Sequence, residues 1–224
     1  MAENIAIMIS SYHLSTWPMP VVMYVISVIM IFAVISGKSA GRRIVSFGLM
    51  LVWFWMGLMV NTYKLGYSHS EVILVTIISI ISGLIFFVKG TIYDKLPFSF
   101  SANIQTYLSI FFLSFALTIE PIAAEIAGLG FPYSETIGLP GPTILFTLGL
   151  MITIEKPFPI RTALCSLIVA LIIFYKLYTD SWLMVVNGLL VLFGIMVAVF
   201  TIRLERTPSK SLVPRLFYSK QESE

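Results

Sequence analysis

Long apolar runs separated by short polar segments dominate this chain of 224 residues. A helix crosses the bilayer core with about 20 apolar residues, or somewhat fewer where neighbouring protein shields it. Runs of this kind predict seven transmembrane helices, at residues 19–37, 44–63, 71–88, 107–128, 142–154, 162–178 and 182–202. We therefore expect an all-α membrane protein with an outer N-terminal segment (1–18), a seven-helix transmembrane domain (19–202) and a cytoplasmic tail (203–224).

Composition supports an integral membrane protein whose first partner is the lipid bilayer. Hydrophobic residues make up 58% of the chain and charged residues only 11%, against about 25% charged residues in soluble domains. The mean hydropathy of +0.96 points the same way. The single cysteine, Cys165, lies inside an apolar run and excludes an internal disulfide or a cysteine-based metal motif.

Basic residues predict how the helices are oriented, because Lys and Arg in short loops stay on the cytoplasmic side of a membrane. Seven spans place all but two of the 14 Lys and Arg residues on one side, and leave Lys64 and Lys176 on the other. The N-terminus is then outside and the C-terminus cytoplasmic.

Two glutamates interrupt the fourth predicted span. A carboxylate inside hydrocarbon costs about 2.5–3.5 kcal/mol, so Glu120 and Glu125 suggest a functional site. Pro121 removes a backbone hydrogen bond and should loosen the helix near residue 117, which makes a cation or proton site plausible. Two other interpretations stay open: a salt bridge from Glu120 to Lys176, and contact of Glu125 with headgroups or water.

Further polar side chains accompany these glutamates in the outer half of the membrane. The predicted topology places Asn61, Lys176 and Asn187 at that depth, whereas the inner half is almost purely apolar. We expect the five polar groups to line an outward-facing cavity that binds an ion or a small solute.

The fifth predicted helix is short and follows a segment rich in Gly and Pro, residues 138–142. Such a helix does not cross a bilayer alone unless the preceding loop dips into the membrane, so we expect it to be short or partly re-entrant. A buried helix start offers unpaired amides to an anion, and this makes Gly141 and Thr143 candidate ligand-binding residues. The alternative is a tight surface turn before a tilted helix.

Several motifs give the chain a family resemblance. They are Gly-Phe-Pro-Tyr at 130–133, the run from Gly138 to Leu150, Tyr12 with Trp17-Pro18, and Val-Trp-Phe-Trp-Met-Gly at 52–57. The sequence resembles a family of small bacterial membrane proteins defined by a domain of unknown function (number 6064). The resemblance implies a multi-spanning fold in a bacterial plasma membrane and no particular reaction. Trp53 and Trp55 lie in the middle of a span, where they could pack between helices or form the wall of a pore.

Other chemistry finds little support in the sequence. The two histidines, His13 and His69, have no second ligand at metal spacing, and no phosphate-binding loop, catalytic triad or nucleic-acid patch is present. We expect no cofactor, no metal and no nucleic-acid partner, whereas a homo-oligomer is compatible with the sequence. The favoured function is a transporter or channel with Glu120 as the coupling carboxylate. Alternatives are a receptor, sensor or assembly module, and, with least support, an intramembrane enzyme.

Overall fold

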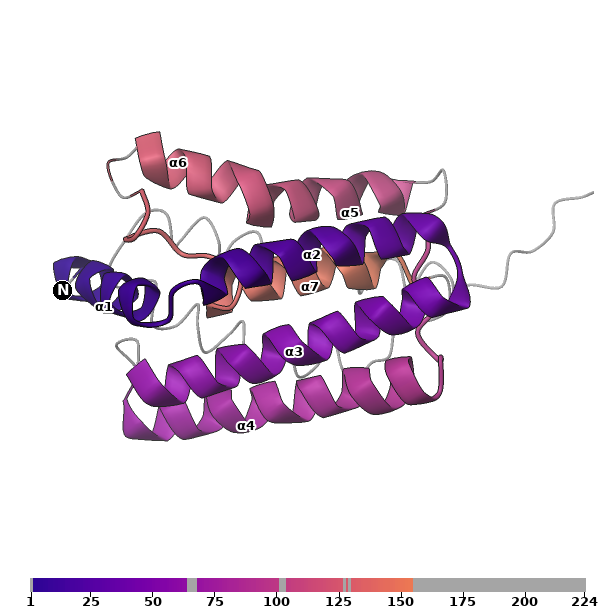
Figure 1. The fold of residues 1–224 in the computed structure, drawn as a ribbon, viewed down its shortest axis with the longest axis horizontal. Coiled ribbons are helices and arrows are strands. Elements are labelled where there is room, and N and C mark those ends of the chain that lie inside the picture. Colours follow the sequence, from indigo (N-terminus) through magenta and orange to yellow (C-terminus); the bar gives the residue numbers. More distant parts are fainter. Residues whose placement is uncertain (1, 64–67, 101–103, 127, 129, 155–224) are drawn as a thin grey trace, which may run out of the picture.

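The computed structural model describes residues 2–63, 68–100, 104–126, 128 and 130–154. These residues form helices connected by short loops, with two isolated β-bridges and no strands. In chain order the helices are α1 (Ala2–Ser15), α2 (Met19–Ser36), α3 (Ser39–Tyr63), α4 (His69–Ile85), the π-helix η1 (Phe86–Ile92), α5 (Ile104–Ser114), the π-helix η2 (Phe115–Ile119), α6 (Glu120–Ile126) and α7 (Pro140–Ile152). Figure 1 shows the longer helices running alongside one another, and α7 packs mainly against α5, with further contacts to η2 and α3.

Within the described residues, four helices are long and apolar enough to cross a membrane: Met19–Ser36, Ser39–Tyr63, His69–Ile92 and Thr106–Ile126. They correspond to the first four predicted spans. The fifth predicted span corresponds to α7, which has 13 residues and is indeed short. The predicted sixth and seventh spans and the tail lie outside the described residues. The described part is therefore a bundle of apolar helices suited to an integral membrane protein.

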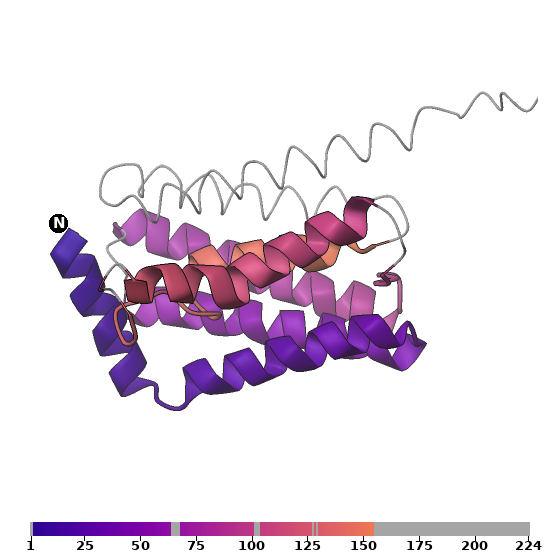
Figure 2. The ribbon, with the colours of Figure 1, turned by 90° about the horizontal axis from the view of Figure 1, so that it is seen from above.

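Helix α1 was not predicted, because residues 1–18 contain only a short apolar patch. In the structure this segment is helical and lies across the end of the bundle, steeply inclined to the other helices (Figure 2). Ile9 and Tyr12 on its inner side form a small apolar cluster with Met59 of α3 and Leu139. Tertiary packing rather than local periodicity therefore accounts for this helix.

Charge separates the two ends of the bundle. We call the end that carries α1 and the start of α7 the α1 end, and the end formed by residues 37–38 and 93–100 the Asp94 end. Every Lys and Arg in the described part of the chain lies at the Asp94 end, namely Lys38, Arg42, Arg43, Lys89 and Lys95. The segments that meet at the α1 end carry glutamates instead, namely Glu3, Glu71, Glu120, Glu125 and Glu135.

Small residues allow α3 and α4 to pack closely. A Cβ atom added to Gly57 would lie 2.9 Å from the Cβ of Ser79, and one added to Gly83 would lie 2.5 Å from the Phe54 ring. The Thr76 hydroxyl also donates to the backbone carbonyl of Gly57 at 3.2 Å. Close approach at small residues, with hydrogen bonds from hydroxyls, is a common way for helices to associate in lipid.

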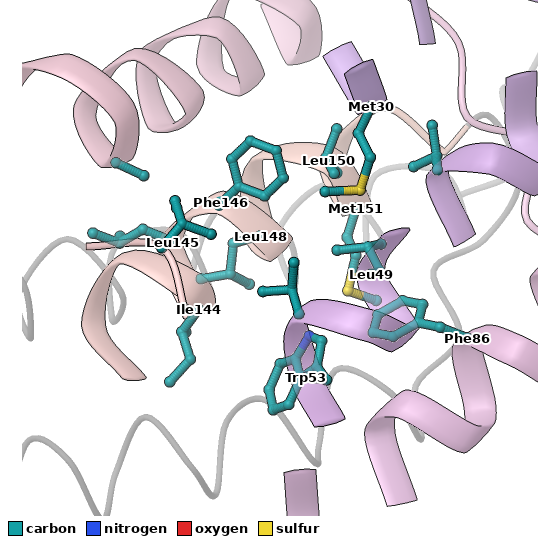
Figure 3. Close-up of a cluster of buried hydrophobic side chains, with 14 of the residues drawn as sticks. Met30, Leu49, Trp53, Phe86, Ile144, Leu145, Phe146, Leu148, Leu150 and Met151 are labelled. Atoms are coloured by element: carbon teal, nitrogen blue, oxygen red, sulfur yellow. The ribbon is translucent and has the colours of Figure 1, made fainter. Parts of the chain in front are cut away.

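Helix α7 is the centre of the described core, and all of its 13 residues are buried. Figure 3 shows its apolar side chains facing Met30 of α2, Leu49 and Trp53 of α3, and Phe86. Because protein surrounds it, α7 does not need the length of a lipid-exposed span. Its C-terminal end is held by a bridge between Phe98 and Ile154, and by the amide of Ser99, which donates to the Thr153 carbonyl at 3.1 Å.

At the Asp94 end an ion pair joins the start of α3 to the segment after η1. Arg42 donates to both carboxylate oxygens of Asp94, at 3.0 and 2.9 Å, and Ser39 adds a hydroxyl at 2.5 Å. The hydrogen bonds from Arg42, followed by the smaller contribution of Ser39, hold the pKa of Asp94 below its ordinary value. The ion pair is thus bidentate and fixes the turn between two candidate spans.

We predict that Asp94→Asn lowers the free energy of unfolding by about 1 kcal/mol at neutral pH, because the bidentate pair loses its charge. In the wild type, ionised Asp94 contributes its full stability above pH about 4, the pKa of an aspartate in an unfolded chain. This contribution is lost as the pH falls through the lower pKa that Asp94 has in the folded protein. Thermal unfolding in detergent at several pH values measures this difference. Lys95→Gln, in the same segment, is the control, and equal effects of the two substitutions would contradict the prediction.

Candidate functional site

At the buried start of α7, each backbone amide is either absent or hydrogen-bonded within the protein. Pro140 and Pro142 have no N–H group, and the amide of Thr143 donates to the Leu139 carbonyl at 3.2 Å. The remaining amide in this turn, that of Gly141, donates to the carboxyl group of Glu135. A helix can begin inside a protein only when its first amides are removed or bonded in this way.

The carboxyl group of Glu135 therefore lies at the start of α7, where an external anion was expected to bind. Burial in the loop before α7 raises the pKa of Glu135 to about 7, and the hydrogen bond from Gly141 opposes that rise. A carboxyl group with this pKa changes its charge near neutral pH. An external anion at Gly141 would have to compete with the ionised form of Glu135.

His13 connects α1 to the same loop. Its Nδ1 lies 2.6 Å from the carbonyl oxygen of Pro132, and its Nε2 lies 3.0 Å from the hydroxyl of Thr136. Because a carbonyl only accepts, Nδ1 carries the proton, and the neutral ring accepts from Thr136 at Nε2. The ring of Phe131 packs against the imidazole at 5.2 Å. Burial lowers the pKa of His13, so its neutral form is favoured.

Two indole groups of α3 extend these polar contacts from the α1 end into the middle of the bundle. The indole N–H of Trp55 donates to the Tyr12 hydroxyl at 3.0 Å, and that of Trp53 donates to the Thr147 hydroxyl at 3.0 Å. Thr147 in turn donates to the backbone carbonyl of Thr143 at 2.7 Å. These contacts support the interpretation of both tryptophans as packing residues with bonded N–H groups.

Gly138 lies at the centre of these contacts. Its φ angle of +103° is one that side chains disfavour, and its amide donates to the Thr143 hydroxyl at 2.9 Å. A Cβ atom added here would lie 2.9 Å from Cδ1 of Trp55 and 3.4 Å from the hydroxyl of Tyr12. The motifs at 12, 53–55, 130–133 and 138–147 thus meet in one place, although they lie far apart in the sequence.

Glu120 lies inside the bundle at the first turn of α6, with only 3% of its surface exposed. It is close enough to the Tyr24 hydroxyl of α2 for the two groups to interact electrostatically. The π-helix Phe115–Ile119 immediately precedes it, which confirms that the helix loosens before Pro121. The widened turn shifts the helical register next to a buried carboxyl group, as π-helical turns often do at functional sites.

Glu125 is exposed, unlike Glu120, and does not share its face of the helix. Its carboxylate lies against Gly130, where an added Cβ atom would overlap it. Asn61, near the end of α3, is also exposed, whereas Gly141 and Thr143 are buried at the start of α7. These residues all lie toward the α1 end, but their exposure divides them into two groups. Lys176 and Asn187 lie outside the described residues, so a cavity joining all seven positions stays a prediction.

Three residues at this end were not identified as site residues from the sequence: His13, Glu135 and Thr136. His13 was considered only as a metal ligand, and neither of its ring nitrogens is available for that role. In the described part of the chain no group of three or more His, Cys, Asp and Glu residues could hold a metal. A weak sequence signal does exist for Glu135, because it is an acidic residue in the loop before a helix that starts with proline. The first amides of a buried helix require an acceptor, and such a residue can supply it.

Protonation of His13 should destabilise the protein. The ring must be neutral to accept from Thr136, so its stabilising contribution is present above pH about 6.5 and is lost as the pH falls through the lowered folded pKa. We predict that His13→Gln costs about 1–3 kcal/mol at neutral pH and flattens this loss on acidification. Thermal unfolding between neutral and mildly acidic pH measures both effects.

His69→Gln is the matched control, since His69 is exposed at the start of α4 and is the other of the two histidines. Titration of Glu135, whose raised pKa acts with the opposite sign, is common to both variants and cancels in the comparison. An unchanged acid response in His13→Gln would contradict the assignment.

Comparison with known proteins identifies one family. The model of a family described as a family of unknown function (DUF6064) matches residues 2–206. None of the curated proteins and none of the solved structures matches this chain.

Proposed function

The chain belongs to the family of unknown function DUF6064, and on this premise we propose that it is a small membrane transporter or channel for an ion or a small solute. The observation that carries the proposal is the position of Glu120, buried in the bundle inside a candidate membrane span. A carboxyl group is costly in such a place and is commonly found there where an ion or a proton is bound.

The neighbourhood of Glu120 supports an exchangeable site. The π-helical turn before Pro121 gives this part of the helix an alternative hydrogen-bond register, and α6 continues for only 7 residues beyond it. Glu135, whose pKa is about 7, provides a second carboxyl group at the same end of the bundle. Two such groups would allow solute binding to be coupled to proton binding near neutral pH.

The proposal includes a topology. Seven spans, with the N-terminus outside and the C-terminus cytoplasmic, would place the Asp94 end and its five basic residues at the cytoplasmic face of a bacterial plasma membrane. The α1 end, with Glu120, Glu125 and Asn61 toward it, would then face outward, and a polar cavity would open there. Lys176 and Asn187 are proposed to contribute from the sixth and seventh spans.

A thermal-shift screen of the purified protein with Na⁺, K⁺, divalent cations, small organic acids and sugars, repeated at several pH values, tests this proposal. A ligand that binds the native state raises the unfolding temperature by mass action. We predict that Glu120→Gln abolishes the shift and that proteoliposomes carrying this variant lose uptake of the same solute. Glu125→Gln, exposed on the same helix, should reduce both by much less than Glu120→Gln does.

The proposal would be contradicted if Glu120→Gln and the wild type showed the same ligand-induced rise in unfolding temperature and the same uptake rate. Circular dichroism of each variant confirms that the helices remain folded, so that a lost shift reports binding.

A receptor, sensor or assembly module is the second candidate. It is favoured by the closed network that runs from the α1 end to the middle of α3, in which His13, Trp53 and Trp55 are all hydrogen-bonded within the protein. This function predicts that Glu120→Gln is tolerated and that the protein purifies in a stable complex with a partner or with further copies of itself.

A further inference from the structure

From residue 7 onward the exposed side chains of α1 include three large apolar ones and none that is charged, although this helix lies outside the candidate spans. Ile7 is 53% exposed and Leu14 is 68% exposed. The other exposed residues in this part of α1 are Met8, Ser11 and Ser15. No Asp, Glu, Lys or Arg occurs anywhere from residue 5 to residue 37. A helix that lay against water would be expected to carry charged residues on this face.

The position of α1 explains this composition. The helix crosses the end of the bundle at a steep inclination to α2 and α3, so it would lie close to the membrane plane when the other helices cross the bilayer (Figure 2). Its inner side is fixed by Tyr12, which is fully buried, and by the hydrogen bonds of His13 to the loop before α7. Its outer side therefore keeps a constant orientation.

The exposed face of α1 is continuous with a surface that lipid would cover. Trp17, which is 60% exposed, lies two residues after the end of α1, and its ring centroid is 6.0 Å from that of the exposed Phe131. Helix α2 begins two residues later, and its exposed side chains are all apolar along the first three turns, including Val21, Val25 and Val28. Tryptophan at the end of an apolar span is typical of the headgroup layer.

We propose that α1 is an interfacial helix whose Ile7, Leu14 and Trp17 side chains lie in the boundary between the headgroups and acyl chains of a lipid bilayer. Burial of an apolar helix face at this depth is an established way for a helix to be held at a membrane surface. The helix links the lipid surface to the start of α7, because His13 on its opposite side bonds the loop that contains Glu135 and Thr136. The inference does not depend on solute transport.

Spin labels attached to single cysteines test the depth of α1. The background variant is Cys165→Ala, and the labelled positions are Leu14→Cys, Val28→Cys in the exposed face of α2, and Ser70→Cys at the exposed start of α4. The full chain is reconstituted into phosphatidylcholine–phosphatidylglycerol vesicles, and collision rates are measured with oxygen, which enters hydrocarbon, and with a water-soluble nickel chelate.

We expect the oxygen-to-nickel ratio at residue 14 to lie between the high value at residue 28 and the low value at residue 70, and severalfold above the latter. A ratio equal to that at residue 70 would overturn the proposal. Protection from both reagents that disappears when the protein is diluted in lipid would also overturn it, because a second copy of the chain would then cover α1. Ile7→Cys repeats the measurement if the label at residue 14 prevents folding.

Discussion

Replacement of Trp53 by alanine is expected to lower the free energy of unfolding by about 3–5 kcal/mol, the range found for large aromatic residues removed from a packed core. Trp53 is fully buried in the middle of α3 and bonds Thr147 of α7 through its indole N–H. Its removal leaves a cavity beside α7 and takes away the N–H group that the Thr147 hydroxyl accepts from, although that hydroxyl still donates to the Thr143 carbonyl. In a membrane protein, lost packing contacts account for more of this free-energy loss than the transfer of the side chain from water does, because lipid is as apolar as the protein core.

Trp53→Phe separates the two contributions, since it keeps most of the ring and removes only the N–H donor. We expect a loss of about 1–2 kcal/mol for this variant, consistent with one buried hydrogen bond and a small cavity. Leu58→Ala, at a position of α3 that is 53% exposed, should change stability by less than either. Unfolding in mixed micelles with increasing sodium dodecyl sulfate provides the measurement, and equal losses for Trp53→Ala and Leu58→Ala would contradict the packing.

Gly138→Ala should cost about 3 kcal/mol, because a side chain at this position is strained and crowded at once. The φ angle of +103° is unfavourable for alanine, and the new methyl group would meet the Trp55 ring at 2.9 Å. The Trp55 indole would have to move and would weaken its hydrogen bond to Tyr12. Tryptophan fluorescence and the unfolding free energy should both change.

Gly128→Ala is the control for backbone strain alone. Gly128 belongs to the same connection between α6 and α7 and has a φ angle of +75°, but nothing lies within 4 Å of its added Cβ atom. Its substitution should cost about 1–2 kcal/mol. A loss for Gly138→Ala no greater than that for Gly128→Ala would show that the start of α7 is not packed as described.

The apolar helices were predictable from sequence because each is a long run of one chemical type. The predicted spans 19–37 and 107–128 match Met19–Ser36 and Thr106–Ile126 to within two residues. The short central helix and the loosened turn before Pro121 were also predictable, since a short apolar run and an internal proline each have a direct backbone consequence. Helix α1 was not, because its stability depends on contacts with α3 and the distant Leu139.

The candidate site was predictable only in part. The burial cost of Glu120 marks it in the sequence, whereas the contacts of His13 join residues 119 and 123 positions apart. No local pattern encodes such a pairing. The same is true of Glu135, whose role follows from the position of the Gly141 amide in a helix that begins inside the protein. Sequence reasoning located the α1 end as polar, but it could not tell which groups bond to one another.

Infrared difference spectroscopy of the Glu120 carboxyl group tests the central claim most directly. Spectra of the reconstituted protein are recorded while the pH or the concentration of a ligand from the thermal-shift screen is changed. If Glu120 binds a proton or a cation, the wild-type spectrum and that of Glu125→Gln should share a carboxyl band that is missing from Glu120→Gln. Identical difference spectra for Glu120→Gln and wild type would contradict the claim.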